Sequence, residues 1–313
     1  MTELADVLDL GSSAEKRAGS SPVLGTNAGI AQLEEQRLCK SKVVGSSPAT
    51  GSKKINVRMG IIMVAIADLD TYTSGMRKSM EDKLWFLNFM SEDITSVYDY
   101  GCADGTLLGI VKKERPGVQL FGYDNSQEML AMAKRRVPGC TLSKKRMEAA
   151  NSGQLTVASS VFHEIHSYGT LESIRGDYQH IFGIGSQYIA IRDMFYSTQM
   201  PVIADKATVR AVRSEASQDM LQEFEDIYGT IELNKNLTHW LLKYRYTENW
   251  ARECRENYLP NSFENFLRSI PQSYELVYAE MYTLPFLRRK IYEDYAIDWR
   301  YPTHGKIYLK KRE

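Results

Sequence analysis

The stretch that decides the fold reads Ser96-Val97-Tyr98-Asp99-Tyr100-Gly101-Cys102-Ala103-Asp104-Gly105. Its first half is rich in residues that favour a β-strand, and its second half is a glycine-containing turn. Residues 106–111 predict a helix that ends before Pro116-Gly117, and a second strand is expected over 118–123, directly before Asp124. Strand, turn, helix, strand and acid in this order predict a βαβ unit that binds a nucleotide-like ligand.

The acid at position 99 separates two ligand classes. Nicotinamide-binding folds need the pattern G-x-G-x-x-G to cradle a pyrophosphate, whereas this chain has Asp99-x-Gly101-x-Ala103-x-Gly105. A carboxylate beside a phosphate is repulsive, but it suits a cationic ligand. Asp124, at the tip of the second strand, can accept hydrogen bonds from both hydroxyls of a ribose.

These features resemble the signature of the class I S-adenosylmethionine-dependent methyltransferases, with Ala103 in place of the middle glycine. The run Gly122-Tyr123-Asp124-Asn125-Ser126-Gln127-Glu128-Met129-Leu130 is similar to the second motif of that family. The resemblance implies that S-adenosylmethionine is the cofactor, with Asp99 near its methionyl end and Asp124 at its ribose. Asn125 and Glu128 also resemble a capping box for a helix over 126–136.

The resemblance implies further contacts with the cofactor. Met147 would pack on the adenine ring, and Glu148 would contact its amine. Tyr72 and Lys78 belong to a leading segment that covers the cofactor in many class I enzymes. The full set of expected cofactor-binding residues is Asp99, Gly101, Cys102, Ala103, Gly105, Asp124, Asn125, Met129, Met147, Glu148, Tyr72 and Lys78.

The resemblance implies an α/β fold class, a seven-stranded, mostly parallel Rossmann-like methyltransferase sheet with helices on both faces. The remaining strands are expected at 140–142, 154–159, 188–194, 274–282 and 306–311, the last one antiparallel. We expect a methyltransferase domain over 59–200 and 272–313. Residues 201–271 are too long for an ordinary connection and predict a helical insertion, an acceptor or lid subdomain, with helices over 206–228, 237–258 and 262–269.

The candidate catalytic residues are His163, Glu164 and His166, just past the fourth strand. Ligands bind at this carboxyl edge of such sheets, and histidine titrates near neutral pH, which suits a general base. The alternative is that these residues cap or brace the next helix. No metal site is predicted, because no third or fourth ligand is visible near the His-x-x-His spacing. Arg192 and Asp193 end the fifth strand; they could face the pocket, but a structural ion pair is favoured.

The acceptor of the methyl group is less well marked. In the insertion, Trp240, Tyr244, Tyr246 and Trp250 alternate with basic residues, as in surfaces that stack bases and hold phosphates. Glutamates offset those charges, however, and the helical spacing favours an amphipathic helix with a core stripe. We therefore expect a small-molecule acceptor before RNA or protein. The alternatives are a catalytically silent S-adenosylmethionine-binding or scaffold module, and a nucleotide-dependent oxidoreductase.

Composition fits a cytoplasmic protein. Lys+Arg and Asp+Glu are equal at 39 each, so the chain has no global attraction to nucleic acid or anionic lipid. No apolar run approaches the length of a membrane span, and the N-terminus lacks a signal-peptide pattern. The four cysteines are scattered, which argues against a disulfide framework and fits a reducing compartment. Composition gives no indication of the oligomeric state.

Residues 1–53 differ from the rest of the chain and contain a repeat. Gly19-Ser20-Ser21-Pro22 recurs as Gly45-Ser46-Ser47-Pro48. The offset between the two copies, converted from codons to nucleotides, matches the length of a tRNA gene with a short spacer. The T-arm consensus of tRNA genes, read in one frame, encodes Gly-Ser-Ser-Pro. The segment therefore resembles two translated tandem tRNA genes, which hints at a phage or bacterial source. We expect residues 1–58 to be a disordered, non-native extension, with Met59 or Met63 as the natural start.

Overall fold

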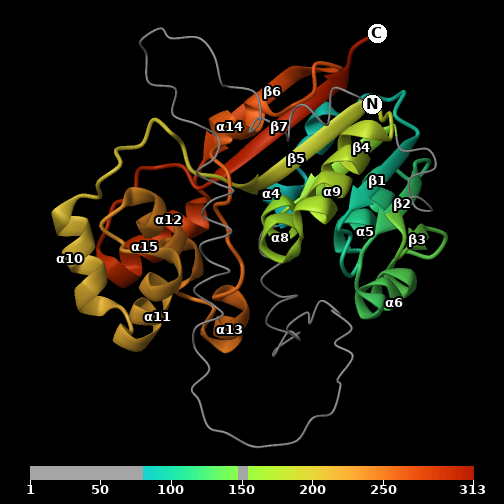
Figure 1. Cartoon of the computed structure of the whole chain (residues 1–313). Coiled ribbons are helices and arrows are strands. Elements are labelled where there is room, and N and C mark those ends of the chain that lie inside the picture. The colour runs from blue at the N-terminus through green and yellow to red at the C-terminus, as the bar shows by residue number, and fades with distance from the viewer. Residues whose placement is uncertain (1–79, 147–153) are drawn as a thin grey trace, which may run out of the picture. The chain divides into compact units, whose positions relative to one another are not determined.

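The strand predicted at 96–100 lies near the middle of one seven-stranded sheet (Figure 1). The computed structural model describes residues 80–146 and 154–313. The strands run in the order β3-β2-β1-β4-β5-β7-β6. Their bounds are β1 Ser96–Tyr100, β2 Gln119–Tyr123, β3 Thr141–Ser143, β4 Leu155–Ser159, β5 Tyr188–Met194, β6 Tyr274–Tyr282 and β7 His304–Lys311.

The sheet confirms the predicted fold class. Strands β3, β2, β1, β4 and β5 pair in parallel, whereas β7 is antiparallel to both β5 and β6. The chain builds β1 to β3 in one direction and then returns to the other side of β1 with β4. In parallel sheets of this kind, ligands bind outside the carboxyl ends of the strands at such a reversal. The site is therefore expected at the ends of β1 and β4.

Helices cover both faces of the sheet, because alternate side chains of β1 point to opposite sides. On one face Val97 shares a core cluster with Phe86 of η1 (Trp85–Phe89) and Leu108 of α5 (Thr106–Glu114). On the other face the Tyr98 hydroxyl lies 3.1 Å from His180 Nε2 of α9 (Leu171–Gly183). The remaining elements beside the site are α4 (Met80–Lys83), α6 (Gln127–Arg136) and α8 (Phe162–Tyr168).

The predicted capping box at Asn125 is wrong by one residue. Ser126 is the N-cap of α6, and its side chain accepts a hydrogen bond from the Met129 N–H at 3.3 Å. The Ser126 side chain can cap the helix because the backbone N–H of Ser126 donates to the Asp124 carboxylate at 2.8 Å, which fixes the position of Ser126. Asn125 is exposed. The acid that precedes the helix thus fixes where the helix begins.

The long helices predicted in the insertion are broken into shorter ones, and a further helix joins them. The first is divided at Ala216-Ser217, and the second ends at Tyr244 and resumes as short turns. Helix α15, between β6 and β7, was not predicted and stands with α10, α11 and α12 beside the sheet in Figure 1. The bounds are α10 Lys206–Glu215, α11 Gln218–Tyr228, α12 Asn234–Lys243, η2 Thr247–Asn249, α13 Trp250–Glu253, α14 Phe263–Arg268 and α15 Pro285–Tyr295.

These helices have their own core. Trp240 is 1% exposed and packs in one cluster with Phe224 and with Ile291 of α15, and Tyr244 and Trp250 lie against it. Trp240 and Tyr244 are thus part of a core, as the helical spacing favoured, but Tyr246 is exposed, and α12 is buried on nearly all sides where a solvated face was expected. Within the described residues, no helix is long and apolar enough to cross a membrane.

Lys243 is a buried cation that ties this core to the segment after α13. It is fully buried, its ammonium donates to the carbonyl oxygens of Glu253 and Glu256, and it lies 4.7 Å from the ring centre of Tyr228 and 4.6 Å from that of Tyr258. Buried polar groups are costly unless they are paired, and here each partner satisfies the other. Lys243 therefore fixes the position of the segment that carries Glu256.

We predict that Lys243→Met lowers the free energy of unfolding by about 2–4 kcal/mol, because it leaves the buried Glu253 carbonyl without a side-chain donor and the Glu256 carbonyl with only the Tyr228 hydroxyl. Urea denaturation measures the change. The matched control is Lys206→Met on exposed α10, which should change stability by less than about 0.5 kcal/mol. Equal effects of the two substitutions would contradict the role given to Lys243.

Candidate cofactor and acceptor site

The turn after β1 folds back over the end of β2. Gly101 and Cys102 both donate their N–H groups to the Tyr123 carbonyl at 2.8 Å. Gly101 and Gly105 have φ of +85° and +73°, and Ala103 has φ of +44°. An added Cβ would meet Val161 at 2.9 Å from position 101 and Ala133 at 2.9 Å from position 105. Glycine is thus required twice, and Ala103 occupies the left-handed conformation that a middle glycine would adopt more easily.

Asp124 is hydrogen-bonded to this turn. Its Oδ2 accepts a hydrogen bond from the Ala103 N–H at 2.9 Å, and its Oδ1 accepts one from Ser126 at 2.8 Å. Burial raises the pKa of Asp124, and the two N–H groups oppose that rise. Each carboxylate oxygen keeps a further lone pair, so an oriented acceptor remains beside the turn for the hydroxyls of a ligand.

Asp99 lies at the end of β1, beneath the turn. It is 3% exposed, and no hydrogen bond to its side chain occurs within residues 80–146 and 154–313. Burial raises the pKa of Asp99 to about 7, although the nearby Lys83 ammonium opposes the rise and Asp124 adds to it. A buried carboxylate without a partner is the kind of group that a cationic ligand would satisfy.

The other expected cofactor residues are placed in different ways. The Cys102 thiol packs against Gly122 in the core, and Met129 is buried in the first turn of α6. Asn125 is exposed beside Asp124. Four expected residues lie outside the described ones: Tyr72, Lys78, Met147 and Glu148.

His163 on α8 is held by Asp193 at the end of β5. The two are joined by a 2.8 Å contact between His163 Nδ1 and Asp193 Oδ1, and Asp193 Oδ2 also accepts the Phe162 N–H at 2.7 Å. Burial lowers the pKa of His163, but the Asp193 carboxylate reverses this, so the pKa lies above its ordinary value. Because Nδ1 is engaged by Asp193, the other ring nitrogen, Nε2, is the one that can act on a ligand.

The predicted ion pair between Arg192 and Asp193 is wrong. Consecutive residues of a strand point to opposite faces, so their side chains cannot meet. Arg192 instead binds Asp82 of α4 at 2.8 Å and donates to Ser160 Oγ at 2.7 Å. The pair Arg192–Asp82 therefore holds α4 at the end of the sheet, next to the site.

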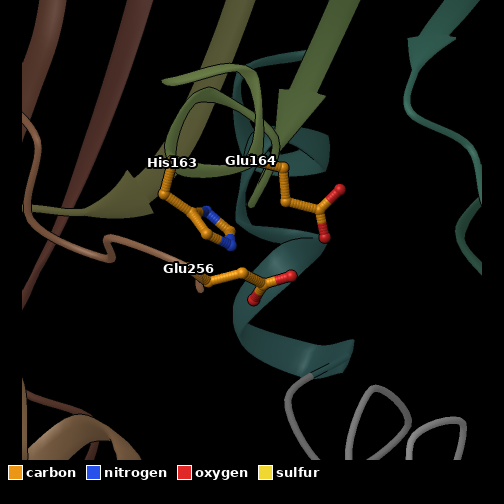
Figure 2. Close-up of side chains that lie close together, drawn as sticks. All are labelled: His163, Glu164 and Glu256. Carbon is orange, nitrogen blue, oxygen red and sulfur yellow. The ribbon is translucent and has the colours of Figure 1, made fainter. Parts of the chain in front are cut away.

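Glu164 faces His163 and a third residue that sequence analysis missed. One ligand atom each of His163, Glu164 and Glu256 lie within 4.8 Å of one another (Figure 2). Arg252 contacts Glu164 at 3.0 Å and Glu256 at 2.7 Å. Burial and the Glu256 carboxylate raise the pKa of Glu164. We call His163, Glu164 and Glu256 the three-residue cluster.

His166 has different partners from His163. Its Nε2 lies 3.0 Å from the Tyr178 hydroxyl and 3.2 Å from Asn261 Nδ2. Burial lowers the pKa of His166 to about 4, so the ring is neutral at pH 7. The structure thus brings His163 and Glu164 together but joins His166 to α9 and to the segment before α14.

Lys83 is a second residue that the sequence pattern did not single out. It ends α4, and no ion pair of its ammonium is found in the described part of the chain. Burial lowers the pKa of Lys83 to about 8, as does the Arg192 charge, whereas Asp99, Glu164 and Asp193 oppose the fall. The Lys83 ammonium therefore interacts electrostatically with Asp99 of β1, with Glu164 of α8 and with Asp193 of β5.

Comparison with known proteins gives partial matches, and no protein-family model matches the chain. Trans-aconitate 2-methyltransferase of Yersinia pestis (strain Pestoides F) is 30% identical over 131 residues, 41% of this chain and 48% of that protein. Carboxy-S-adenosyl-L-methionine synthase of Methylococcus capsulatus is 47% identical over 47 residues, 14% of this chain and 19% of that protein. The chain thus spans about half the length, or less, of these curated relatives.

Solved structures with a related outline include two methyltransferases. The plantazolicin methyltransferase BpumL is 12% identical, with a TM-score of 0.45 over 91% of this chain and 98% of its own. Magnesium protoporphyrin IX methyltransferase from Synechocystis PCC 6803 is 10% identical, with a TM-score of 0.40 over 94% of this chain and 100% of its own.

We predict that Asp99→Asn raises the free energy of unfolding at pH 8 by roughly 1–3 kcal/mol. The unfolded carboxyl ionises near pH ~3.9, whereas the folded one ionises at a pKa of about 7. The wild-type penalty is therefore absent below the lower value and grows as the pH rises to the upper one. Urea denaturation at pH 5 and pH 8 tests this. A gain that is the same at both pH values would contradict the account.

Proposed function

We propose that the protein is an S-adenosylmethionine-dependent methyltransferase that acts on a small molecule. The observation that carries the proposal is Asp99, a buried carboxylate without a hydrogen bond among the described residues, at the carboxyl end of the central strand. The cofactor carries an ammonium and a sulfonium, and no phosphate. A dinucleotide would bring a pyrophosphate to the same turn, where Asp99 would repel it.

The residues around Asp99 fit the remainder of the cofactor. Asp124 is oriented by the N–H groups of Ala103 and Ser126, and its remaining lone pairs suit the ribose hydroxyls. Gly101 and Gly105 let the turn pack against Val161 and Ala133, where a Cβ would not fit. When bound, the cofactor supplies an already activated methyl group, so the chain contributes mainly positioning and the exclusion of water.

The acceptor would lie against α8, which follows the neighbouring strand β4. His163 and Glu164 face this side, and they are the residues that would receive a proton from an acceptor that has one to lose. His166 would support Tyr178 and Asn261. The name of the curated relatives that match over 131 residues, trans-aconitate 2-methyltransferase, agrees with a small acceptor.

Titration calorimetry with S-adenosylmethionine, S-adenosylhomocysteine and NAD tests the cofactor assignment. The wild-type protein should bind the first two and not the third. Asp124→Ala should weaken their binding by about tenfold or more, since a charged hydrogen bond contributes roughly 1.5–3 kcal/mol. Glu128→Ala, on the exposed side of α6, is the control and should bind normally.

Tight binding of NAD without any response to S-adenosylhomocysteine would refute the proposal and favour an oxidoreductase. Binding without turnover would favour a silent module. Radiolabelled methyl transfer into fractionated metabolite, RNA and protein pools then identifies the acceptor class, and label in RNA or protein alone would refute the small-molecule part.

A further inference from the structure

We propose that the three-residue cluster binds a divalent cation of the first transition row, such as Mn²⁺ or Zn²⁺. His163 and Glu164 come from α8, and Glu256 comes from the segment after α13. Figure 2 shows the imidazole and the two carboxylates directed toward one space. One imidazole nitrogen and two carboxylate oxygens are a ligand set that such ions bind well in proteins.

The orientation of His163 is the first argument. A metal-binding histidine usually donates its other ring N–H to a carboxylate, which fixes the ring and raises the basicity of the ligand nitrogen. Here Nδ1 lies 2.8 Å from Asp193 Oδ1, and His163 is only 5% exposed. Nε2 is therefore the nitrogen that remains for a metal ion. The ring that carries it is buried and held in a fixed direction.

The charges around the cluster are the second argument. Arg252 contacts Oε1 of both Glu164 and Glu256, and the Tyr168 hydroxyl donates to the same Oε1 of Glu256 at 2.9 Å. Each carboxylate keeps a second oxygen that these bonds do not use. The single positive charge of Arg252 lies beside the two carboxylates of Glu164 and Glu256. A further cation between these carboxylates would therefore be stabilised.

The spacing allows a metal ion after a small movement. Metal–ligand bonds of about 2.0–2.2 Å place neighbouring ligand atoms roughly 3–4 Å apart. The ligand atoms of the cluster lie within 4.8 Å of one another. Rotation of the Glu164 side chain, which is 36% exposed, can close a gap of this size without moving the backbone.

Three protein ligands leave coordination positions open, as in catalytic metal sites. The inference deepens the proposed function and rests on it: the open positions would take an oxygen of the acceptor, such as a hydroxyl or carboxylate. His163 and Glu164 would then be metal ligands and could not also accept the proton. The two roles exclude each other, and a binding experiment distinguishes them.

The experiment uses the full chain, stripped of metals with a chelator and titrated with Mn²⁺ under calorimetry and electron paramagnetic resonance. We expect one Mn²⁺ per chain. Glu256→Gln keeps an acceptor oxygen for Arg252 and Tyr168 but removes the charge, and should weaken Mn²⁺ binding about tenfold or more. The control is Glu253→Gln, which removes a neighbouring buried carboxylate outside the cluster and should bind Mn²⁺ normally.

Circular dichroism checks that each variant is folded, and Glu164→Gln, at a more exposed position, replaces Glu256→Gln if the latter does not fold. Absence of stoichiometric binding by the wild type, or equal binding by the cluster variants and the control, would overturn the inference. The Mn²⁺ titration needs no cofactor, so its failure is separate from a failure to bind S-adenosylmethionine.

Discussion

Burial of the Asp99 carboxylate is the constraint on which the site depends. The side chain lies at the end of the central strand, where water is largely excluded, and its hydrogen-bonding capacity is unused in the described part of the chain. Such a group lowers the stability of the empty protein. Two nearby residues belong to the same arrangement. Asp124 faces the same turn, and the Lys83 ammonium partly offsets the negative charge of Asp99. A cationic ligand would complete the arrangement.

The surroundings of His163 and Glu164 are assembled from segments that are far apart in the sequence. β5 contributes Asp193 to His163 on one face and Arg192 to Asp82 of α4 on the other. The insertion contributes Arg252 and Glu256, and the buried Lys243 fixes that segment through its carbonyl groups. Changes in the packing of the insertion would therefore reach the cluster through a short chain of contacts.

Local patterns, together with the family resemblance, predicted the strands of the sheet. The β-formers of β1, the glycine-rich turn and the acid after β2 stand next to one another in the chain, and the structure places β5 and β6 at the predicted residues. The breaks in the insertion helices and the helix α15 were not predicted, because tertiary packing decides them. The sequence pattern could not single out Glu256 either. Glu256 reaches the cluster together with Arg252, and Arg252 lies 88 residues after Glu164 in the chain.

The most direct test of the central claim is the pH dependence of S-adenosylmethionine binding, measured by titration calorimetry between pH 5.5 and pH 8. If Asp99 binds the cationic end of the cofactor, affinity should rise about tenfold per pH unit below pH ~7 and level off above it, because the carboxyl must lose its proton first. Asp99→Asn should bind weakly at every pH. An affinity that does not change with pH in the wild type, or tight binding by Asp99→Asn, would contradict the account.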